Sequence, residues 1–185
     1  MKKNLAFIAI GCLLSCMTEV TKNQSNMNDR HDSHSFARPD IAKTSHLDLN
    51  LVVNFDKKLV SGKAGFKIEH TNAKEIILDT RELTIHKVTD KDDRALQYSL
   101  GDKAEHLGTP LTIQINSSTN YIYVYYETQP TAAALQWLKP EQTTDKKLPF
   151  LFTQGQAILT RSWIPCQDSP GVRMTYTAQL QVPVD

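Results

Sequence analysis

Apolar and polar residues alternate between His46 and Phe55, and again between Val60 and Glu69, with a polar link at residues 56–58. Side chains of a β-strand point alternately to two faces, so each run predicts a strand with one buried face. The positions assigned to that face are Leu47, Leu49, Leu51, Val53 and Phe55, then Val60, Gly62, Ala64, Phe66 and Ile68. Two such strands with a short link predict an antiparallel hairpin.

Shorter segments with strand character follow this hairpin. They are residues 76–78, 83–88, 95–100, 111–115, 121–126 and 174–184. The segment 121–126 is rich in aromatic and β-branched residues, which favour strands. Only residues 132–138 look helical, over barely two turns. Many short strands at this spacing predict an all-β fold, either a sandwich or a curved sheet.

The amino-terminal residues resemble a bacterial export signal. Lys2 and Lys3 precede an apolar run at residues 5–14, which is too short to cross a bilayer. The run leads into Leu-Leu-Ser-Cys at residues 13–16, which resembles a lipoprotein box. The resemblance implies cleavage of the signal peptide, residues 1–15, and attachment of lipid to Cys16. Several acyl chains, at about 0.8 kcal/mol for each buried CH₂ group, make a durable anchor.

Export therefore predicts a lipoprotein anchored to a membrane of the bacterial cell envelope, on the periplasmic or outer-membrane side. Two alternatives remain open at this point. Cys12 is a weaker candidate for lipidation, and an ordinary secretory signal with incidental cysteines is also compatible with the sequence.

Residues 16–45 are mostly polar, so they bury too little apolar surface to offset the entropy of ordering them. This composition predicts a flexible tether, followed by a folded domain over residues 46–185. His31 and His34 have a spacing that could hold a metal. In a flexible tether without a fixed third ligand, however, we interpret them as solvated side chains.

The overall composition excludes one class of function. The formal net charge is +1, and 22% of the residues are charged. This balance gives no electrostatic basis for binding nucleic acid. Cleavage before Cys16 would leave Cys166 as the other cysteine of the mature chain, so we expect a packed core rather than a disulfide framework.

Polar and aromatic residues concentrate between Ala134 and Pro183, beside glycines and prolines. Cys166 could act as a nucleophile only beside a histidine, and a buried structural thiol is the preferred interpretation. Asp168 could be an acid or a ligand, but in its Gln-Asp-Ser-Pro context a turn cap is preferred. Because the chain contains no HExxH, GxSxG or phosphate-loop motif, we assign no catalytic residue and no metal ligand.

Gln154, Gly155 and Gln156 form a different kind of candidate. Each amide side chain offers both a donor and an acceptor, and the glycine between them permits tight backbone geometry. Such a pair can bind the amino terminus and backbone of a peptide without carrying charge. A structural turn is the alternative.

Around these residues the chain resembles the M1 family of zinc aminopeptidases, in its leukotriene A4 hydrolase-like branch. The matching segments are residues 134–138, 140–143, 151–152, 154, 156–158, 165–168, 170 and 175–178. The resemblance is strong over roughly the last third of the chain and looser over residues 46–70. It implies a saddle-like, β-rich amino-terminal domain, followed in relatives by a thermolysin-like zinc domain and a helical domain.

The resemblance also implies that Gln154, Gly155 and Gln156 line the peptide site, with the Gln156 amide contacting the free amino terminus of the substrate. In full-length relatives a zinc ion polarises the scissile carbonyl and activates water. The family's GxMEN motif and HExxH helix are absent from this chain, so the catalytic zinc domain is absent too. We therefore expect no cofactor and no aminopeptidase activity from these residues alone.

Two hypotheses about function follow. In the first, the chain is the amino-terminal part of a lipoprotein zinc metallo-aminopeptidase and lines the substrate cleft of that enzyme. A frameshift or a gene boundary would cut this enzyme short before its catalytic domain. The second is a non-catalytic, membrane-tethered module that binds peptides or serves as a scaffold. The intact Gln154–Gln156 segment motivates both.

Overall fold

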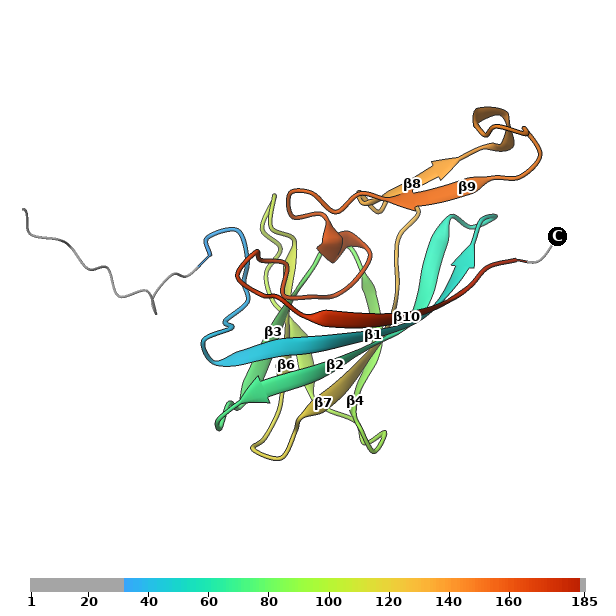
Figure 1. The fold of residues 1–185 in the computed structure, drawn as a ribbon. Helices are drawn as coiled ribbons and strands as arrows, with labels where there is room; N and C mark the ends of the chain where they lie inside the picture. The colour runs from blue at the N-terminus through green and yellow to red at the C-terminus, as the bar shows by residue number, and fades with distance from the viewer. Residues whose placement is uncertain (1–31, 184–185) are drawn as a thin grey trace, which may run out of the picture. The chain divides into compact units, whose positions relative to one another are not determined.

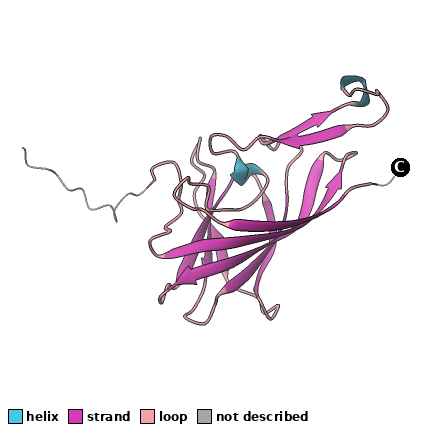
Figure 2. Cartoon of the chain, in the orientation of Figure 1, coloured by secondary structure: helices cyan, strands magenta, loops and turns pink. Residues whose placement is uncertain are grey.

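The computed structural model of the chain describes residues 32–183, which consist almost entirely of strands and the loops between them (Figures 1 and 2). This confirms the all-β prediction. The strands are β1 (Ala42–Asn54), β2 (Leu59–His70), β3 (Glu75–Thr80), β4 (Thr84–Asp90), β5 (Tyr98–Leu100), β6 (Thr109–Gln114), β7 (Tyr121–Glu127), β8 (Leu135–Leu138), β9 (Phe150–Thr153) and β10 (Thr175–Gln181). Two short 3₁₀ helices are η1 (Pro140–Gln142) and η2 (Thr160–Ser162).

The largest sheet has five strands in the order β10-β1-β2-β7-β4 (Figure 1). The antiparallel pair of β1 and β2 confirms the hairpin predicted from the alternating pattern. Strand β10, from the carboxyl-terminal end of the chain, pairs in parallel with β1 at the edge of this sheet. One face of the sheet carries the alternating apolar side chains into the core.

A second sheet, in the order β3-β6-β5, packs against that face. Side chains from both sheets form one buried cluster, which includes Leu51, Phe66 and Val124 from the larger sheet and Leu78 and Ile113 from the smaller one. All five are fully buried. Strands β8 and β9 form a separate antiparallel hairpin.

The prediction of a helix at residues 132–138 is wrong. Residues 135–138 form β8, which pairs with β9 from Leu135 opposite Thr153 to Leu138 opposite Phe150. An isolated helix of two turns is marginal in water, and pairing with a neighbouring strand supplies backbone partners that such a helix lacks. The long-range partner therefore overrides the local preference.

The boundary expected at residue 45 also differs from the structure. Strand β1 begins at Ala42, and Ser35 and Ala37 are each only 3% exposed. These residues fold because polar groups of the segment bind buried partners, which a count of apolar residues does not detect. The expected signal peptide, Cys16 and the tether up to residue 31 lie outside the described residues.

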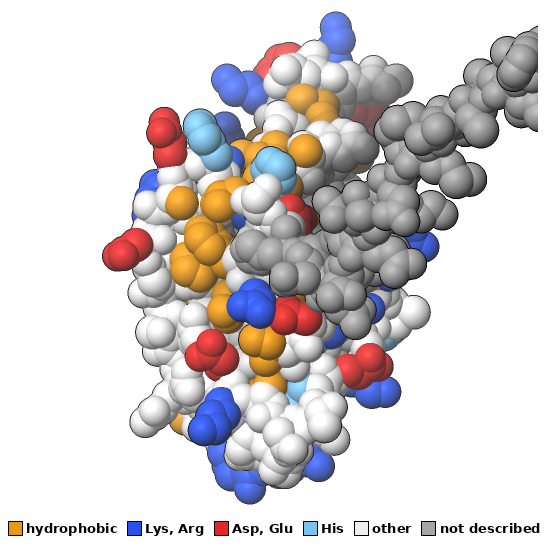
Figure 3. Space-filling view, turned by 90° about the vertical axis from the view of Figure 1, so that its left-hand side faces the viewer, with side chains coloured by type: hydrophobic (Ala, Val, Ile, Leu, Met, Phe, Trp, Pro, Cys, Tyr) orange, Lys and Arg blue, Asp and Glu red, His pale blue; other side chains and the backbone are white. Residues whose placement is uncertain are grey.

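The surface of this unit carries both signs of charge. Figure 3 shows acidic and basic side chains interspersed on one face, with hydrophobic side chains between them. Such mixing matches the small net charge of the chain. Within residues 32–183, no helix is long and apolar enough to span a membrane.

Candidate peptide-binding site

The Gln154–Gln156 segment directly follows β9. Both glutamines are exposed, whereas Gly155 is half-buried. The Gln154 backbone N–H donates to the Ala134 carbonyl at 2.9 Å, and the Gln154 side-chain oxygen accepts from the Gln156 backbone N–H at 3.1 Å. The backbone of the segment is therefore fixed, while the Gln156 side chain faces solvent.

Gly155 allows the chain to fold tightly back on itself. A Cβ atom at this position would lie 2.5 Å from the Thr160 hydroxyl oxygen, so any larger residue would require that hydroxyl to move. The Gly155 carbonyl accepts a hydrogen bond from the Leu159 N–H at 2.8 Å. The residue type thus fits a close backbone approach, as the sequence suggested.

Ser162 ties the far end of this loop to the same place as its beginning. Its hydroxyl donates to the Leu159 carbonyl at 2.7 Å and accepts from the Ala134 N–H at 3.0 Å. Ala134 therefore contacts both ends of the loop, through its carbonyl at Gln154 and its N–H at Ser162. Residues 154–162 form a closed structure against the start of β8.

Arg161, next to Ser162, is fully buried and lies beside two carboxylates, of which Asp79 is fully buried and Asp168 is 12% exposed. Its Nε atom and its backbone N–H each donate to Asp168 Oδ2 at 3.2 Å. Its Nη1 atom donates to the Leu107 carbonyl at 2.8 Å and lies 3.6 Å from Asp79 Oδ1. We call Arg161, Asp79 and Asp168 the hub, because segments distant in sequence meet there.

Asp79, at the end of β3, completes the hub from the smaller sheet. Its Oδ2 atom accepts from the Ser35 hydroxyl at 2.6 Å and from the Asp168 N–H at 2.9 Å. Its backbone forms an antiparallel bridge with Cys166. Each buried charge thus has several hydrogen-bond partners, which a charged group needs when it leaves water.

The Pro-Cys-Gln-Asp run at residues 165–168 attaches the loop to the domain. The Gln167 side chain, 2% exposed, donates to the Ala42 carbonyl at 2.8 Å and accepts from the Thr44 N–H at 2.9 Å. Burial, followed by the nearby Asp168 and Asp79 carboxylates, raises the pKa of the Cys166 thiol. Cys166 is therefore a buried neutral thiol, which is the interpretation that the sequence favoured. The Asp168 carboxylate accepts from Arg161, in place of the turn cap expected for it.

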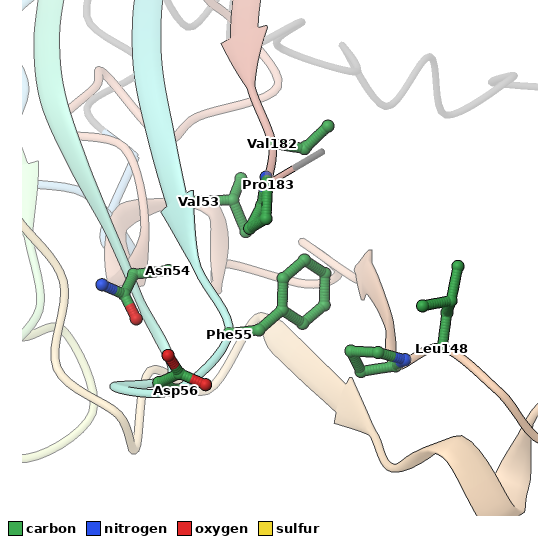
Figure 4. A pocket seen from close by; sticks show the side chains of 8 residues that line it. Val53, Asn54, Phe55, Asp56, Leu148, Val182 and Pro183 are labelled. Carbon is green, nitrogen blue, oxygen red and sulfur yellow. The ribbon is translucent and has the colours of Figure 1, made fainter. Parts of the chain in front are cut away.

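An apolar surface lies beside this loop, on the β8–β9 hairpin. Phe150 and Phe152 are 54% and 44% exposed. A pocket of about 510 Å³ opens between this hairpin, the end of β1 and the chain after β10, with Phe55, Leu148 and Val182 in its lining (Figure 4). Phe55 also meets Trp137 edge to face, with ring centroids 5.4 Å apart, so Trp137 is a packing residue.

Strand β10 extends the apolar surface along the sheet edge. Its register places Tyr176 beside Leu47 and Leu180 beside Leu51, so both lie on the core-facing side of the sheet. Nevertheless Tyr176 is 71% exposed and Leu180 is 57% exposed, whereas Leu51 is fully buried. The apolar face of the sheet that is buried at β1 therefore extends onto β10, where its side chains are exposed.

The other face of β10 is held by polar cross-strand pairs, which we call the β10 ladder. They are His46 with Thr175, whose atoms are 2.6 Å apart, Asp48 with Thr177, and Asn50 with Gln179 at 3.4 Å. The Thr177 hydroxyl, and then the Tyr121 hydroxyl, lower the pKa of the Asp48 carboxyl by donating to it. The ladder fixes the register of β10.

The sequence indicates the exposed Gln154–Gln156 segment but not the buried hub that holds it. Asp79 ends the apolar run of β3, and a charged residue directly after Ile76, Ile77 and Leu78 was the available signal for a buried ion. Within residues 32–183, no three His, Cys, Asp or Glu side chains are grouped as a metal would require. The described residues therefore do not fit a zinc ion.

Known proteins match this chain over most of its length. The Peptidase M1 N-terminal domain model matches residues 43–185. Leukotriene A-4 hydrolase of Xenopus laevis is 37% identical over 159 residues, and leucine aminopeptidase 2 of Ajellomyces capsulatus is 35% identical over 176 residues. These matches cover 82% and 91% of this chain but 26% and 28% of the relatives.

Solved structures show the same likeness. Native yeast leukotriene A4 hydrolase has a TM-score of 0.79 and 31% identity, over 91% of this chain and 27% of that chain. An M1 zinc metallopeptidase of Deinococcus radiodurans, bound to a Tyr-Ser-Ala substrate, has a TM-score of 0.58 at 15% identity and supports the fold alone. The chain thus spans about a quarter of the length of the two curated relatives.

Proposed function

Since the chain belongs to the M1 peptidase family through that family's amino-terminal domain, we propose that it forms one wall of the peptide cleft of a zinc aminopeptidase. The observation that carries this proposal is the Gln154–Gln156 segment. Its amide side chains are exposed while its backbone is fixed by the loop and the hub. A fixed backbone that presents an exposed Gln156 amide is suited to orienting a ligand.

The chemistry of the segment fits a peptide amino terminus. A free amino group is a cation with several N–H donors, and a glutamine side chain offers a carbonyl oxygen to accept from it. The Gln156 amide is our first choice for this contact. Because a neutral amide holds the ligand without an ion pair, we expect a modest contribution of the Gln156 amide to substrate affinity.

Bond cleavage belongs to another part of such an enzyme. In the proposed full-length protein a zinc ion would polarise the scissile carbonyl and activate water. Residues 32–183 bind and orient the peptide in this proposal and supply no zinc ligands. We expect the purified 185-residue chain to hydrolyse no chromogenic amino-acid amide, and chelator-sensitive hydrolysis by the pure chain would overturn this.

The uncovered apolar face supports the assignment to an amino-terminal domain. Tyr176, Leu180 and Val182 are each more than half exposed, and the β8–β9 hairpin adds Phe150 to this surface. Exposed apolar surface of this kind is typical of an interface with another domain or protein. In our proposal, the catalytic domain covers it.

We also propose that Cys16 carries the lipid that anchors the protein to a membrane of the cell envelope. The Leu-Leu-Ser-Cys sequence at residues 13–16 supports this. Replacement by Cys16→Ser should release the protein from the membrane fraction, with Cys12→Ser as the matched control that stays bound. Release by Cys12→Ser instead would assign the lipid to the other cysteine.

Two experiments test the enzymatic proposal. The DNA that follows the codon for Asp185 should encode GxMEN and HExxH motifs in some frame, and unrelated sequence there would count against an aminopeptidase. In the enzyme so completed, Gln156→Ala should raise KM for peptides more than it lowers kcat, because the amide binds the substrate throughout the reaction. If the downstream DNA is unrelated but the chain binds peptides, the alternative of a tethered binding module is favoured.

A further inference from the structure

The segment from Asp32 to Ala37, which we call the clasp, joins the predicted tether to the folded unit. Ser35 is 3% exposed, and its hydroxyl donates to Asp79 at 2.6 Å. The Phe36 N–H donates to the other oxygen of the same carboxylate at 2.7 Å. Two of the hydrogen bonds that satisfy the buried Asp79 charge therefore come from residues that composition assigned to a flexible linker.

The clasp also binds the other members of the hub. The His34 carbonyl accepts from Arg161 Nη2 at 2.8 Å, and the same nitrogen donates to the Asp168 carbonyl at 3.1 Å. The Ser169 hydroxyl donates to Asp32 and lowers the pKa of that carboxyl. The clasp thus contacts Asp79 and Arg161 directly, and it contacts the residue that follows Asp168.

A short path leads from the hub to the glutamine segment. Arg161 directly follows Thr160, whose hydroxyl fills the space beside Gly155. The Ile164 N–H donates to the Thr160 carbonyl at 3.0 Å, and the Leu159 N–H donates to the Gly155 carbonyl at 2.8 Å. These contacts provide a continuous path of packed and hydrogen-bonded neighbours between Arg161 and Gly155.

The arrangement of charges gives the clasp a specific effect. Arg161 lies between two carboxylates, at 3.2 Å from Asp168 and at 3.6 Å from Asp79. While Ser35 and Phe36 donate to Asp79, Arg161 donates to Asp168 and stays 3.6 Å from Asp79. Without the Ser35 hydroxyl, Asp79 is a buried carboxylate short of one donor, and the nearest cation available to it is Arg161.

From these contacts we infer that the clasp is a positioning element of the peptide site, with the Ser35 hydroxyl holding Arg161, and through it Gln154–Gln156, in place. The identity of the ligand rests on the proposed function, whereas the mechanical link does not. The link also means that the predicted membrane tether enters the fold at the residues that set the geometry of the site.

The test compares Ser35→Ala with the control Ser33→Ala in the full 185-residue chain. Ser33 is exposed, and its hydroxyl lies 3.4 Å from the His34 ring. We expect amide hydrogen exchange at residues 154–162 to accelerate about tenfold or more in Ser35→Ala, with no change in Ser33→Ala. Amides of β7, in the large sheet, should keep their wild-type rates in both variants.

Unchanged exchange at residues 154–162 in Ser35→Ala would overturn the inference. Equal acceleration in β7 would also overturn it, because the hydroxyl would then act on global stability alone. A second readout is the chemical-shift change that the tripeptide Ala-Ala-Ala causes at Gln156, which we expect Ser35→Ala to weaken. If the wild type shows no such change, the proposed function fails, and the exchange data still decide on the clasp.

Discussion

The hub and the β10 ladder both attach a late segment of the chain to earlier ones, and both are centred on aspartate. The hub is buried, since the side chains of Arg161 and Asp79 are fully buried and that of Asp168 is 12% exposed. The Asp48 side chain of the ladder is 42% exposed. Both join segments that are far apart in the chain, but the hub connects loops with a strand of the smaller sheet, whereas the ladder connects two neighbouring strands of the larger sheet.

This difference in burial explains what each network does. A buried ion must be satisfied by fixed partners, so removing one partner forces the remainder to rearrange. An exposed carboxylate replaces a lost partner with water at small cost. The hub can therefore hold a loop in one conformation, while the ladder sets only the register of an edge strand.

The largest expected effect comes from removing the cation of the hub. Arg161→Met should lower the free energy of unfolding by about 3–5 kcal/mol, because two buried carboxylates lose their shared partner. Urea denaturation followed by circular dichroism measures this. The control is Arg173→Met at an exposed position, and a loss below about 1 kcal/mol for Arg161→Met would show that the hub contributes little.

The matching change in the ladder should cost much less. Thr177→Val keeps the shape of the side chain and removes the hydroxyl that donates to Asp48. We expect a loss of about 0.5–1 kcal/mol, since the pair is partly solvated. The same denaturation experiment measures it, and a loss as large as that of Arg161→Met would remove the distinction between the two networks.

The acid sensitivity of the ladder provides a finer test. Hydrogen bonds from Thr177 and then Tyr121 hold the pKa of Asp48 below its ordinary value of 3.8. A lowered pKa in the folded state stabilises the protein above the unfolded pKa, and this contribution is lost as the pH falls through the folded value. Between about pH 5 and pH 3, Thr177→Val should therefore lose less of its stability than the wild type. Parallel curves for the two proteins would contradict this.

The smallest effect on stability is expected on the apolar face of β10. Leu180→Lys should change the free energy of unfolding by no more than about 0.5 kcal/mol, because Leu180 is 57% exposed. It should reduce self-association of the chain in sedimentation experiments, since a charge on an edge strand opposes pairing. Gln181→Lys, on the polar face of the same strand but outside the ladder, serves as the control for added charge alone.

The alternation of apolar and polar residues predicted β1 and β2, because the face that each side chain of a strand takes follows a local period of two. It could not predict the hub, because the partners of Arg161 lie at residues 34, 79, 107 and 168, and no local pattern connects them. The clasp was expected to be part of the flexible tether for the same reason. Ser35 looks like linker sequence until its distant partner Asp79 is known.

The candidate site divides in the same way. Gln154–Gln156 stands out locally, since two amides flank a glycine. Its attachment through Ala134, Ser162 and the hub depends on contacts across the fold. The helix expected at residues 132–138 is wrong for the same reason. Residues 135–138 form β8 because they pair with β9, which comes after the η1 loop in the chain.

The measurement that tests the central claim most directly is an amide ¹H–¹⁵N spectrum of the chain during titration with Ala-Ala-Ala. Its amino-acetylated form is the matched control, because it differs only at the amino terminus. We predict shifts at residues 154–156 that saturate at millimolar peptide, and no comparable shifts with the acetylated form. Absence of shifts at these residues, or equal shifts with both peptides, would contradict binding of a peptide amino terminus by this segment.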